Sequence, residues 1–168
     1  EARFKVDFDV LLQENPDTVA WIRFDEPSII SYPVVKSADN KEYLTKTFTE
    51  SDNKLGAIFM DMRNTSDFSD KNTMIYGHNM KNGSMFNNIK SYTDQSFADE
   101  HPYVYIYLPD GTVSQYKVVV GHIISEESVL YNTYIENTSS YLQEMVKTSS
   151  IHVDFDQSQV QSLITLST

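Results

Sequence analysis

The stretch YVYIYLPDGTVSQYKVVVGHII, residues 103–124, decides the fold class of this chain. Two runs rich in Val, Ile and Tyr flank the triplet Pro109-Asp110-Gly111. Proline presets a φ that suits a turn, and glycine adopts a positive φ at little cost, so the triplet predicts a tight connection between antiparallel strands. A β-hairpin is therefore expected here, and its composition is typical of a β-rich protein.

Other short β-like runs occur along the rest of the chain. They lie at 18–24, 30–36, 56–61, 72–78 and 162–166. Pro33 indicates an edge strand or a bend, because proline cannot donate a hydrogen bond to a neighbouring strand. With the hairpin, the count is about seven strands, mostly antiparallel. This pattern predicts a mostly β barrel or sandwich, with one strand missing from a closed arrangement.

Helical segments are expected to be short and peripheral. The apolar residues of RFKVDFDVLLQENPD share one helical face, so an N-terminal helix is predicted over 3–14. A second helix is expected at 139–147 with Ser140 as its N-cap, inside a long strand-to-strand connection over 125–150. No repeat or linker divides the sequence, which predicts a single domain over 1–168.

The composition argues against several classes of function. The 168 residues carry 13 Lys and Arg against 24 Asp and Glu, a formal net charge of −11. Such an acidic chain repels polyanions, so nucleic-acid binding is not expected. Cysteine is absent, and the histidines show no spacing typical of metal ligands, so neither a disulfide nor a metal site is predicted. No run is long and apolar enough to span a membrane, and the first residues do not form a signal peptide.

Among the four histidines, His78 has the most suggestive context. It follows an apolar run, at a place where the end of a strand delivers a side chain to a cleft. A strand-end histidine without a chemical role is the plain alternative. His101 is expected in a solvated loop, His122 at the end of a strand and His152 on the outer face of a strand. The carboxylates form no evident acid–base pair.

Taken together, several stretches resemble the sortases, and class B most closely. They are NPDTVAWIRFD at 15–25, YPVVKSADNKEYL at 32–44, GAIFMDMRN at 56–64, DKNTMIYGHNMKNGSMF at 70–86 and ITLST at 164–168. Their order and spacing follow the family over essentially the whole chain. The resemblance implies a sortase-like, eight-stranded β-barrel with short peripheral helices.

The same resemblance implies functional residues outside the 168 residues of this sequence. Sortases carry the signature Thr-Leu-x-Thr-Cys at the end of the penultimate strand, and this sequence reads Thr-Leu-Ser-Thr over 165–168. A nucleophilic cysteine is therefore expected directly after Thr168, and an active-site arginine on a last strand that the sequence does not include. An N-terminal anchor, also outside the sequence, would hold the protein at the extracellular face of the bacterial cell membrane.

The activity implied by the resemblance is that of a cysteine transpeptidase that needs no metal or organic cofactor. The thiolate would cleave a sorting signal of the type Asn-Pro-x-Thr-(Asn/Gly) after Thr. The Thr carbonyl would then be joined to an amine of a peptidoglycan precursor or of a pilin lysine. His78 would serve as general acid and then as general base. The residues that match the family's peptide groove are Asn40, Leu44, Tyr76, Leu130, Tyr131 and Ser167.

Other interpretations stay open. Leu44, Tyr76 and Leu130 also fit ordinary core packing. A chain without cysteine fits a non-catalytic, sortase-like surface binding module or an inactive truncated form. A serine hydrolase that uses Ser167 and His78 is the weakest alternative, because Ser167 lacks the glycine-rich turn that exposes a serine nucleophile. An unactivated hydroxyl is also a far weaker nucleophile than a thiolate.

Overall fold

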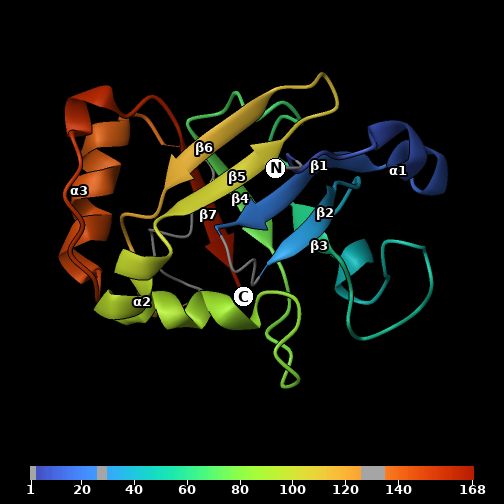
Figure 1. Ribbon diagram of the computed structural model, residues 1–168, viewed down its shortest axis with the longest axis horizontal. Coiled ribbons are helices and arrows are strands. Elements are labelled where there is room, and N and C mark those ends of the chain that lie inside the picture. The colour runs from blue at the N-terminus through green and yellow to red at the C-terminus, as the bar shows by residue number, and fades with distance from the viewer. Residues whose placement is uncertain (1–2, 26–29, 126–134) are drawn as a thin grey trace.

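Seven strands form one curled sheet in the computed structural model, which describes residues 3–25, 30–125 and 135–168. The strands are β1 (Thr18–Phe24), β2 (Ser31–Val35), β3 (Ile58–Met60), β4 (Asn72–Tyr76), β5 (Tyr103–Tyr107), β6 (Val113–Lys117) and β7 (Leu163–Ser167). Their order in the sheet is β6-β5-β1-β2-β3-β4-β7, so β6 and β7 are its two edges. The sheet curls into a nearly closed barrel with helices on its periphery (Figure 1), which confirms the predicted mostly β fold.

Most neighbouring strands are antiparallel, as predicted. The predicted hairpin is the β5–β6 pair, and Gly111 in its turn has a φ of +89°. Two pairs are parallel: β2 with β3, and β4 with β7. Parallel strands end at the same edge of a sheet, so the carboxyl ends of β4 and β7 lie together.

Pro33 lies in an internal strand, so the edge-strand alternative of the prediction was wrong. β2 is flanked by β1 on one side and by β3 on the other. The proline is tolerated because β3 is short and pairs only with Val34 and Val35, which leaves Pro33 with a neighbour on the β1 side alone. A missing N–H costs little where no second strand needs it.

Short helices surround the sheet. They are the α-helices α1 (Phe8–Glu14), α2 (Gln95–Glu100) and α3 (Thr138–Thr148), and the 3-10 helices η1 (Glu42–Leu44), η2 (Asn87–Thr93) and η3 (Gln157–Gln159). In Figure 1, α3 stands beside β6 at one end of the molecule and α1 lies at the other end. None of the helices in the described ranges combines the length and the apolar character needed to cross a membrane.

Two helices begin at residues other than those predicted. α1 begins at Phe8 and not at residue 3, because the Asp7 carboxylate accepts a hydrogen bond from the Val10 N–H at 3.2 Å and caps the helix there. α3 has Asn137 as its N-cap, and not Ser140 as predicted. The Asn137 side chain accepts from the Ser140 N–H at 3.0 Å. In both cases the capping acceptor precedes the donating N–H by three residues, which closes the first turn.

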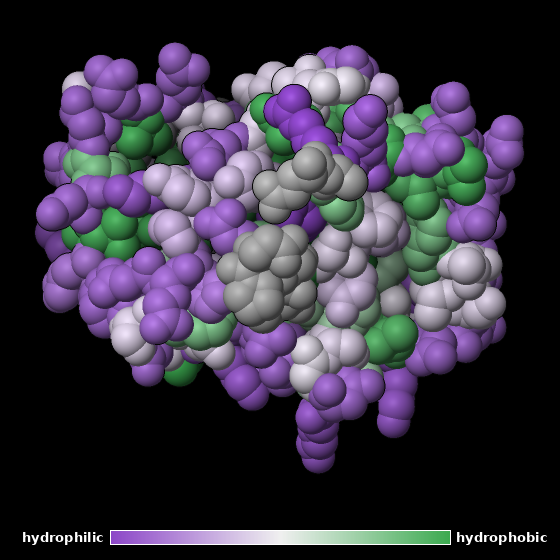
Figure 2. All heavy atoms as spheres, in the orientation of Figure 1, coloured by the Kyte–Doolittle hydropathy of each residue, from purple (hydrophilic) through white to green (hydrophobic). Residues whose placement is uncertain are grey.

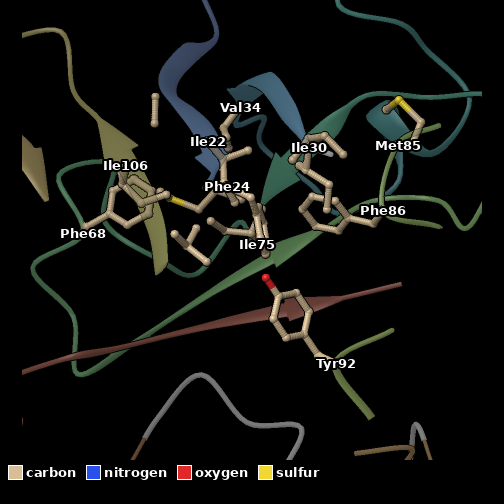
Figure 3. Close-up of a cluster of buried hydrophobic side chains, with 14 of the residues drawn as sticks. Ile22, Phe24, Ile30, Val34, Phe68, Ile75, Met85, Phe86, Tyr92 and Ile106 are labelled. Atoms are coloured by element: carbon tan, nitrogen blue, oxygen red, sulfur yellow. The ribbon is translucent and has the colours of Figure 1, made fainter. Parts of the chain in front are cut away.

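The core fills the inside of the curled sheet. In β1, buried and half-buried residues alternate, as expected for a strand with one face toward the core. Figure 3 shows Ile22, Ile30 and Phe86 among the apolar side chains that point into this core, with Tyr92 reaching it from the side of β7. The face in Figure 2 is mostly hydrophilic, with hydrophobic residues in separate groups.

The barrel is open between its two edge strands. A cavity of about 830 Å³ lies there, lined by Tyr116, Val118, Leu142, Met145, Ile164 and Leu166 among others. All five residues of β7 are only half-buried, whereas four of the five residues of the neighbouring β4 are buried. The inner face of β7 is therefore accessible along the opening. Ser167 and Thr168 line the cavity at its end.

Candidate active site at the ends of β4 and β7

His78 stands two residues beyond the end of β4, and close packing fixes the chain that leads to it. Gly77 is buried, and a Cβ at this position would collide with the side chains of Ile58 and Phe86. Beyond Gly77, the His78 carbonyl accepts a hydrogen bond from the Phe86 N–H at 2.9 Å, which folds the following loop back. The His78 side chain is thus delivered, partly exposed, from a rigid strand end.

A backbone carbonyl orients the His78 imidazole. Nε2 lies 2.6 Å from the carbonyl oxygen of Leu44. A carbonyl oxygen only accepts hydrogen bonds, so this contact requires a proton on Nε2. In the neutral ring, Nδ1 is then the nitrogen that accepts a proton. The contact therefore selects the tautomer in which Nδ1 is the base.

Leu44 is held in place by its neighbour Tyr43. The Tyr43 hydroxyl donates to the Asp17 carboxylate at 2.7 Å. Burial, together with this hydrogen bond, raises the pKa of Tyr43 well above its usual value. Tyr43 is 1% exposed and packs in a second apolar cluster with Val35, Ala57 and Phe59. With Tyr43 anchored, the Leu44 side chain remains 40% exposed beside the histidine.

Gly56 packs against the contact between Leu44 and His78. It has a φ of +62°, and a Cβ there would lie 2.5 Å from the Tyr43 oxygen, 2.8 Å from the Leu44 oxygen and 3.1 Å from His78 Cδ2. Any side chain at this position would push against the hydrogen bond between Leu44 and His78. Both the φ and the space therefore require glycine.

A buried carboxylate links two of the predicted groove residues. The Asp61 side chain is 0% exposed and follows β3 directly. It accepts hydrogen bonds from Asn40 Nδ2 at 3.1 Å, from the Tyr76 hydroxyl at 2.6 Å and from Arg63 Nη2 at 2.9 Å. Burial by itself would raise the pKa of Asp61, but the hydrogen bonds from Arg63 and Tyr76 outweigh it and lower the pKa to about 2. The carboxylate is therefore ionised at neutral pH.

Asn40 and Tyr76 are oriented by this network. The Asn40 Oδ1 accepts from the Met62 N–H at 2.7 Å, so both ends of the amide have partners. The Tyr76 ring packs against Phe59 with the ring centroids 5.2 Å apart. Tyr76 therefore packs against a core residue while it stays half-buried, and its role in a peptide groove stays a prediction.

Ser167 is brought beside the same strand end by the parallel pairing. It lies opposite Tyr76 in the register of β4 and β7, and its carbonyl accepts from the Gly77 N–H at 3.0 Å. Leu130 and Tyr131 lie outside the residues that the structure describes. The roles proposed for all of these residues stay predictions.

Sequence reasoning missed Asp61, Met62 and Gly56, all within the stretch 56–64. Asp61 was detectable in principle, because a carboxylate directly after an apolar strand lies at the end of that strand. Its importance was hidden because its partners come from positions 21 residues earlier and 15 residues later in the chain. Met62, the residue after Asp61, is 44% exposed.

The other histidines are not part of this site. His101 is 9% exposed and packs against Phe97 with the ring centroids 4.5 Å apart, so the prediction of a solvated loop was wrong. His152 is exposed but lies in a loop and not on a strand. His122 Nδ1 lies 2.7 Å from the Thr148 hydroxyl, and burial lowers the pKa of the ring. Across the described ranges, no three His, Asp or Glu side chains group in a way that would hold a metal ion.

Comparison with known proteins identifies the family. The model of the Sortase domain matches residues 26–168. This chain belongs to the sortase family. Sortase B of Listeria monocytogenes is 35% identical over 161 residues, which is 92% of this chain and 63% of that protein. The chain therefore spans less than two thirds of that relative.

Solved class B structures share the fold. Sortase B of Staphylococcus aureus has a TM-score of 0.88 at 27% identity, covering 96% of this chain and 77% of that one. The S. aureus sortase B–substrate complex has a TM-score of 0.82 at 28% identity, covering 89% and 69% of the two chains. The predicted resemblance to class B sortases is confirmed.

Proposed function

We propose that this protein is the catalytic domain of a class B cysteine transpeptidase. It would cleave a sorting signal of the type Asn-Pro-x-Thr-(Asn/Gly) and join the Thr carbonyl to an amine. The observation that carries the proposal is the position of His78, which stands at the end of β4 with Nε2 bound to the Leu44 carbonyl, beside the end of β7. Membership of the sortase family supplies the reaction class.

The strand register supports the position directly after Thr168 as the place of the nucleophile that the family resemblance implies. Tyr76 of β4 lies opposite Ser167 of β7, and the Gly77–Ser167 hydrogen bond extends the ladder. Because the two strands are parallel, two further steps along each bring His78 level with the position after Thr168. A thiol there would meet the one histidine at this strand end. Within the described chain, no hydrogen bond joins the Ser167 hydroxyl to His78, which disfavours the serine alternative.

The chemistry proceeds in two acyl transfers. The thiolate attacks the Thr carbonyl carbon, the C–N bond breaks, and the imidazolium of His78 gives its Nδ1 proton to the leaving amine. A thioester and a neutral imidazole remain. The incoming amine then attacks the thioester, His78 Nδ1 takes a proton from it, and the C–S bond breaks to release the thiolate. Throughout, the Leu44 carbonyl keeps the Nε2 proton and stabilises the charged ring.

The groove and the partners follow from the same arrangement. The peptide would lie over Asn40, Leu44, Tyr76 and Ser167, with Leu130 and Tyr131 as further predicted contacts. The open side of the barrel along β7 would receive the eighth strand and its arginine. The acceptor would be an amine of a peptidoglycan precursor or a pilin lysine, and the site of action the extracellular face of the membrane. No cofactor enters the proposed steps.

The first test is to sequence the gene beyond the codon for Thr168 and to assay the full-length protein. A cysteine codon is expected at once, and an arginine codon on the next strand. The protein should then join a quenched fluorescent peptide containing Asn-Pro-Ala-Thr-Asn to triglycine, as followed by mass spectrometry. Any other residue after Thr168, with peptide binding but no ligation, would favour the non-catalytic binding module.

Replacement of His78 tests its role. His78→Ala should lower ligation about 10²–10⁴-fold with little change in the melting temperature, because the proton donor to the leaving amine is lost. His152→Ala is the matched control, since this histidine is exposed and its only hydrogen bonds in the described chain are those of its backbone with Gln95. Ligation by His78→Ala at the rate of His152→Ala would refute the assignment.

A further inference from the structure

We propose that Asp61 is a positioning residue for the peptide groove, holding Asn40 and Tyr76 in the orientation in which they receive the substrate. The inference rests on the proposed transpeptidase function, and it adds a residue that does not itself touch the peptide. Asp61 is suited to this role because its side chain is fully buried while its hydrogen-bond partners are in part exposed.

The two carboxylate oxygens have different tasks. Oδ1 accepts from the Arg63 N–H at 2.9 Å and from Arg63 Nε at 3.0 Å, which fixes the turn after β3. Oδ2 accepts from Asn40 Nδ2, the Tyr76 hydroxyl and Arg63 Nη2. One oxygen atom is thus the common partner of a loop residue and a residue at the end of β4, which are 36 positions apart by their numbers. Removing that acceptor would release both at once.

The surroundings of the network fit a peptide and not a charged ligand. The guanidinium of Arg63 pairs with Asp61, so the network has no net charge. Two exposed apolar residues belong to the same site: Met62, directly after Asp61, is 44% exposed, and Leu44, whose carbonyl binds His78, is 40% exposed. Met62 is bound to the network through its own N–H, which donates to Asn40. An extended peptide needs apolar contacts and oriented polar groups of this kind, because its own backbone groups must be satisfied when water is displaced.

The network fixes the direction of an N–H donor on the Asn40 amide. An amide nitrogen carries two N–H donors, and the contact with Asp61 uses one of them. With the Oδ1 atom also bound, the plane of the amide is fixed, and so is the direction of the second N–H. A fixed donor costs less entropy when it binds a substrate carbonyl than a rotating one does. The loss of Asp61 should therefore weaken peptide binding more than it slows the chemical steps.

The test is Asp61→Asn in the full-length protein, assayed with the Asn-Pro-Ala-Thr-Asn peptide and triglycine. This isosteric change removes the charge and places an amide where Oδ2 or Oδ1 stood. We expect KM to rise about tenfold while kcat changes less than about threefold. Tyr76→Phe combined with Asp61→Asn should raise KM by less than the product of the two single effects, because the two residues act through one hydrogen bond.

Asp70→Asn is the matched control. Asp70 lies at the far end of the same loop, where it accepts from the Thr65 N–H and from Asn64 Nδ2 and touches neither groove residue. It should lose stability with an unchanged KM. If Asp61→Asn loses stability but keeps the KM of Asp70→Asn, Asp61 is only structural and the inference is wrong. If the wild-type protein itself neither cleaves nor joins the peptide, the proposed function fails and the inference fails with it.

Discussion

Replacing Gly56 by alanine should damage both the stability of the protein and the orientation of His78. The added Cβ would stand 2.5 Å from the Tyr43 oxygen and 2.8 Å from the Leu44 oxygen, closer than such atoms approach one another. The backbone oxygens cannot rotate away as the end of a side chain can. The chain around η1 must therefore shift, and the Leu44 carbonyl with it.

The expected loss of stability has two parts. Alanine at the positive φ of Gly56, +62°, costs about 1–2 kcal/mol relative to glycine. Forcing a methyl group into a packed site costs about 1–3 kcal/mol more. The free energy of unfolding should therefore fall by about 2–5 kcal/mol, the sum of the two.

Gly111→Ala separates the two contributions. Gly111 also has a positive φ, +89°, but a Cβ there has no heavy atom within 4 Å. It should show the conformational cost of about 1–2 kcal/mol alone. Urea unfolding of both variants, followed by tryptophan fluorescence of Trp21, measures the difference. The reasoning is refuted if Gly56→Ala is no less stable than Gly111→Ala.

The kinetic constants of Gly56→Ala and Gly111→Ala provide a second comparison of the two variants. A displaced Leu44 carbonyl no longer holds the Nε2 proton of His78, so the tautomer with Nδ1 as the base loses its support. In the full-length protein, Gly56→Ala should lower kcat more than it changes KM, whereas Gly111→Ala should change neither. An unchanged kcat in Gly56→Ala would show that the contact with Leu44 does not orient the His78 ring for the proposed reaction.

Three further predictions concern stability. The hydrogen bonds of Asp61 lower its pKa from the usual 3.8 to about 2, so its ionised form adds about 2 kcal/mol to the free energy of unfolding above pH 4. This contribution is lost as the pH falls toward 2. Urea unfolding at pH 6 and at pH 2.5 should therefore show a smaller fall in the free energy of unfolding for Asp61→Asn than for the wild-type protein. Asn15→Ala should cost about 2–4 kcal/mol, because the buried Asn15 Nδ2 donates to both the Tyr43 hydroxyl and the Phe48 carbonyl; a loss below 1 kcal/mol would contradict this. Leu142→Ala should cost only about 2–3 kcal/mol in thermal unfolding, since the vacated space joins the existing cavity.

The strands were predictable because each is a local pattern. The run at 18–24 became β1 with the bounds expected, and the Pro109-Asp110-Gly111 turn joins β5 to β6 as the hairpin predicted within 103–124. Two features predicted wrongly, the start of the first helix and the place of Pro33, depended on a capping side chain and on the length of a neighbouring strand. Asp7 shortened the first helix by capping it, and the shortness of β3 allowed Pro33 inside the sheet.

The candidate site was predictable only in part. His78 was identifiable from its place after an apolar run and from the family resemblance. Asp61 was not assigned a role, because a carboxylate accepts hydrogen bonds from several residues only where the fold brings their donors close to it. Neighbourhoods of this kind are formed by packing and not by spacing along the chain.

The sequence by itself determined the β-rich architecture, the turn between β5 and β6, and the histidine at a strand end, because propensity and periodicity act over a few residues. Only the tertiary structure decided that β4 and β7 run parallel, so that Ser167 lies beside Tyr76. It also decided that Leu44 supplies the carbonyl that holds His78, and that Asp61 joins Asn40 to Tyr76. These contacts connect residues 15 to 91 positions apart, and their formation depends on burying one common core.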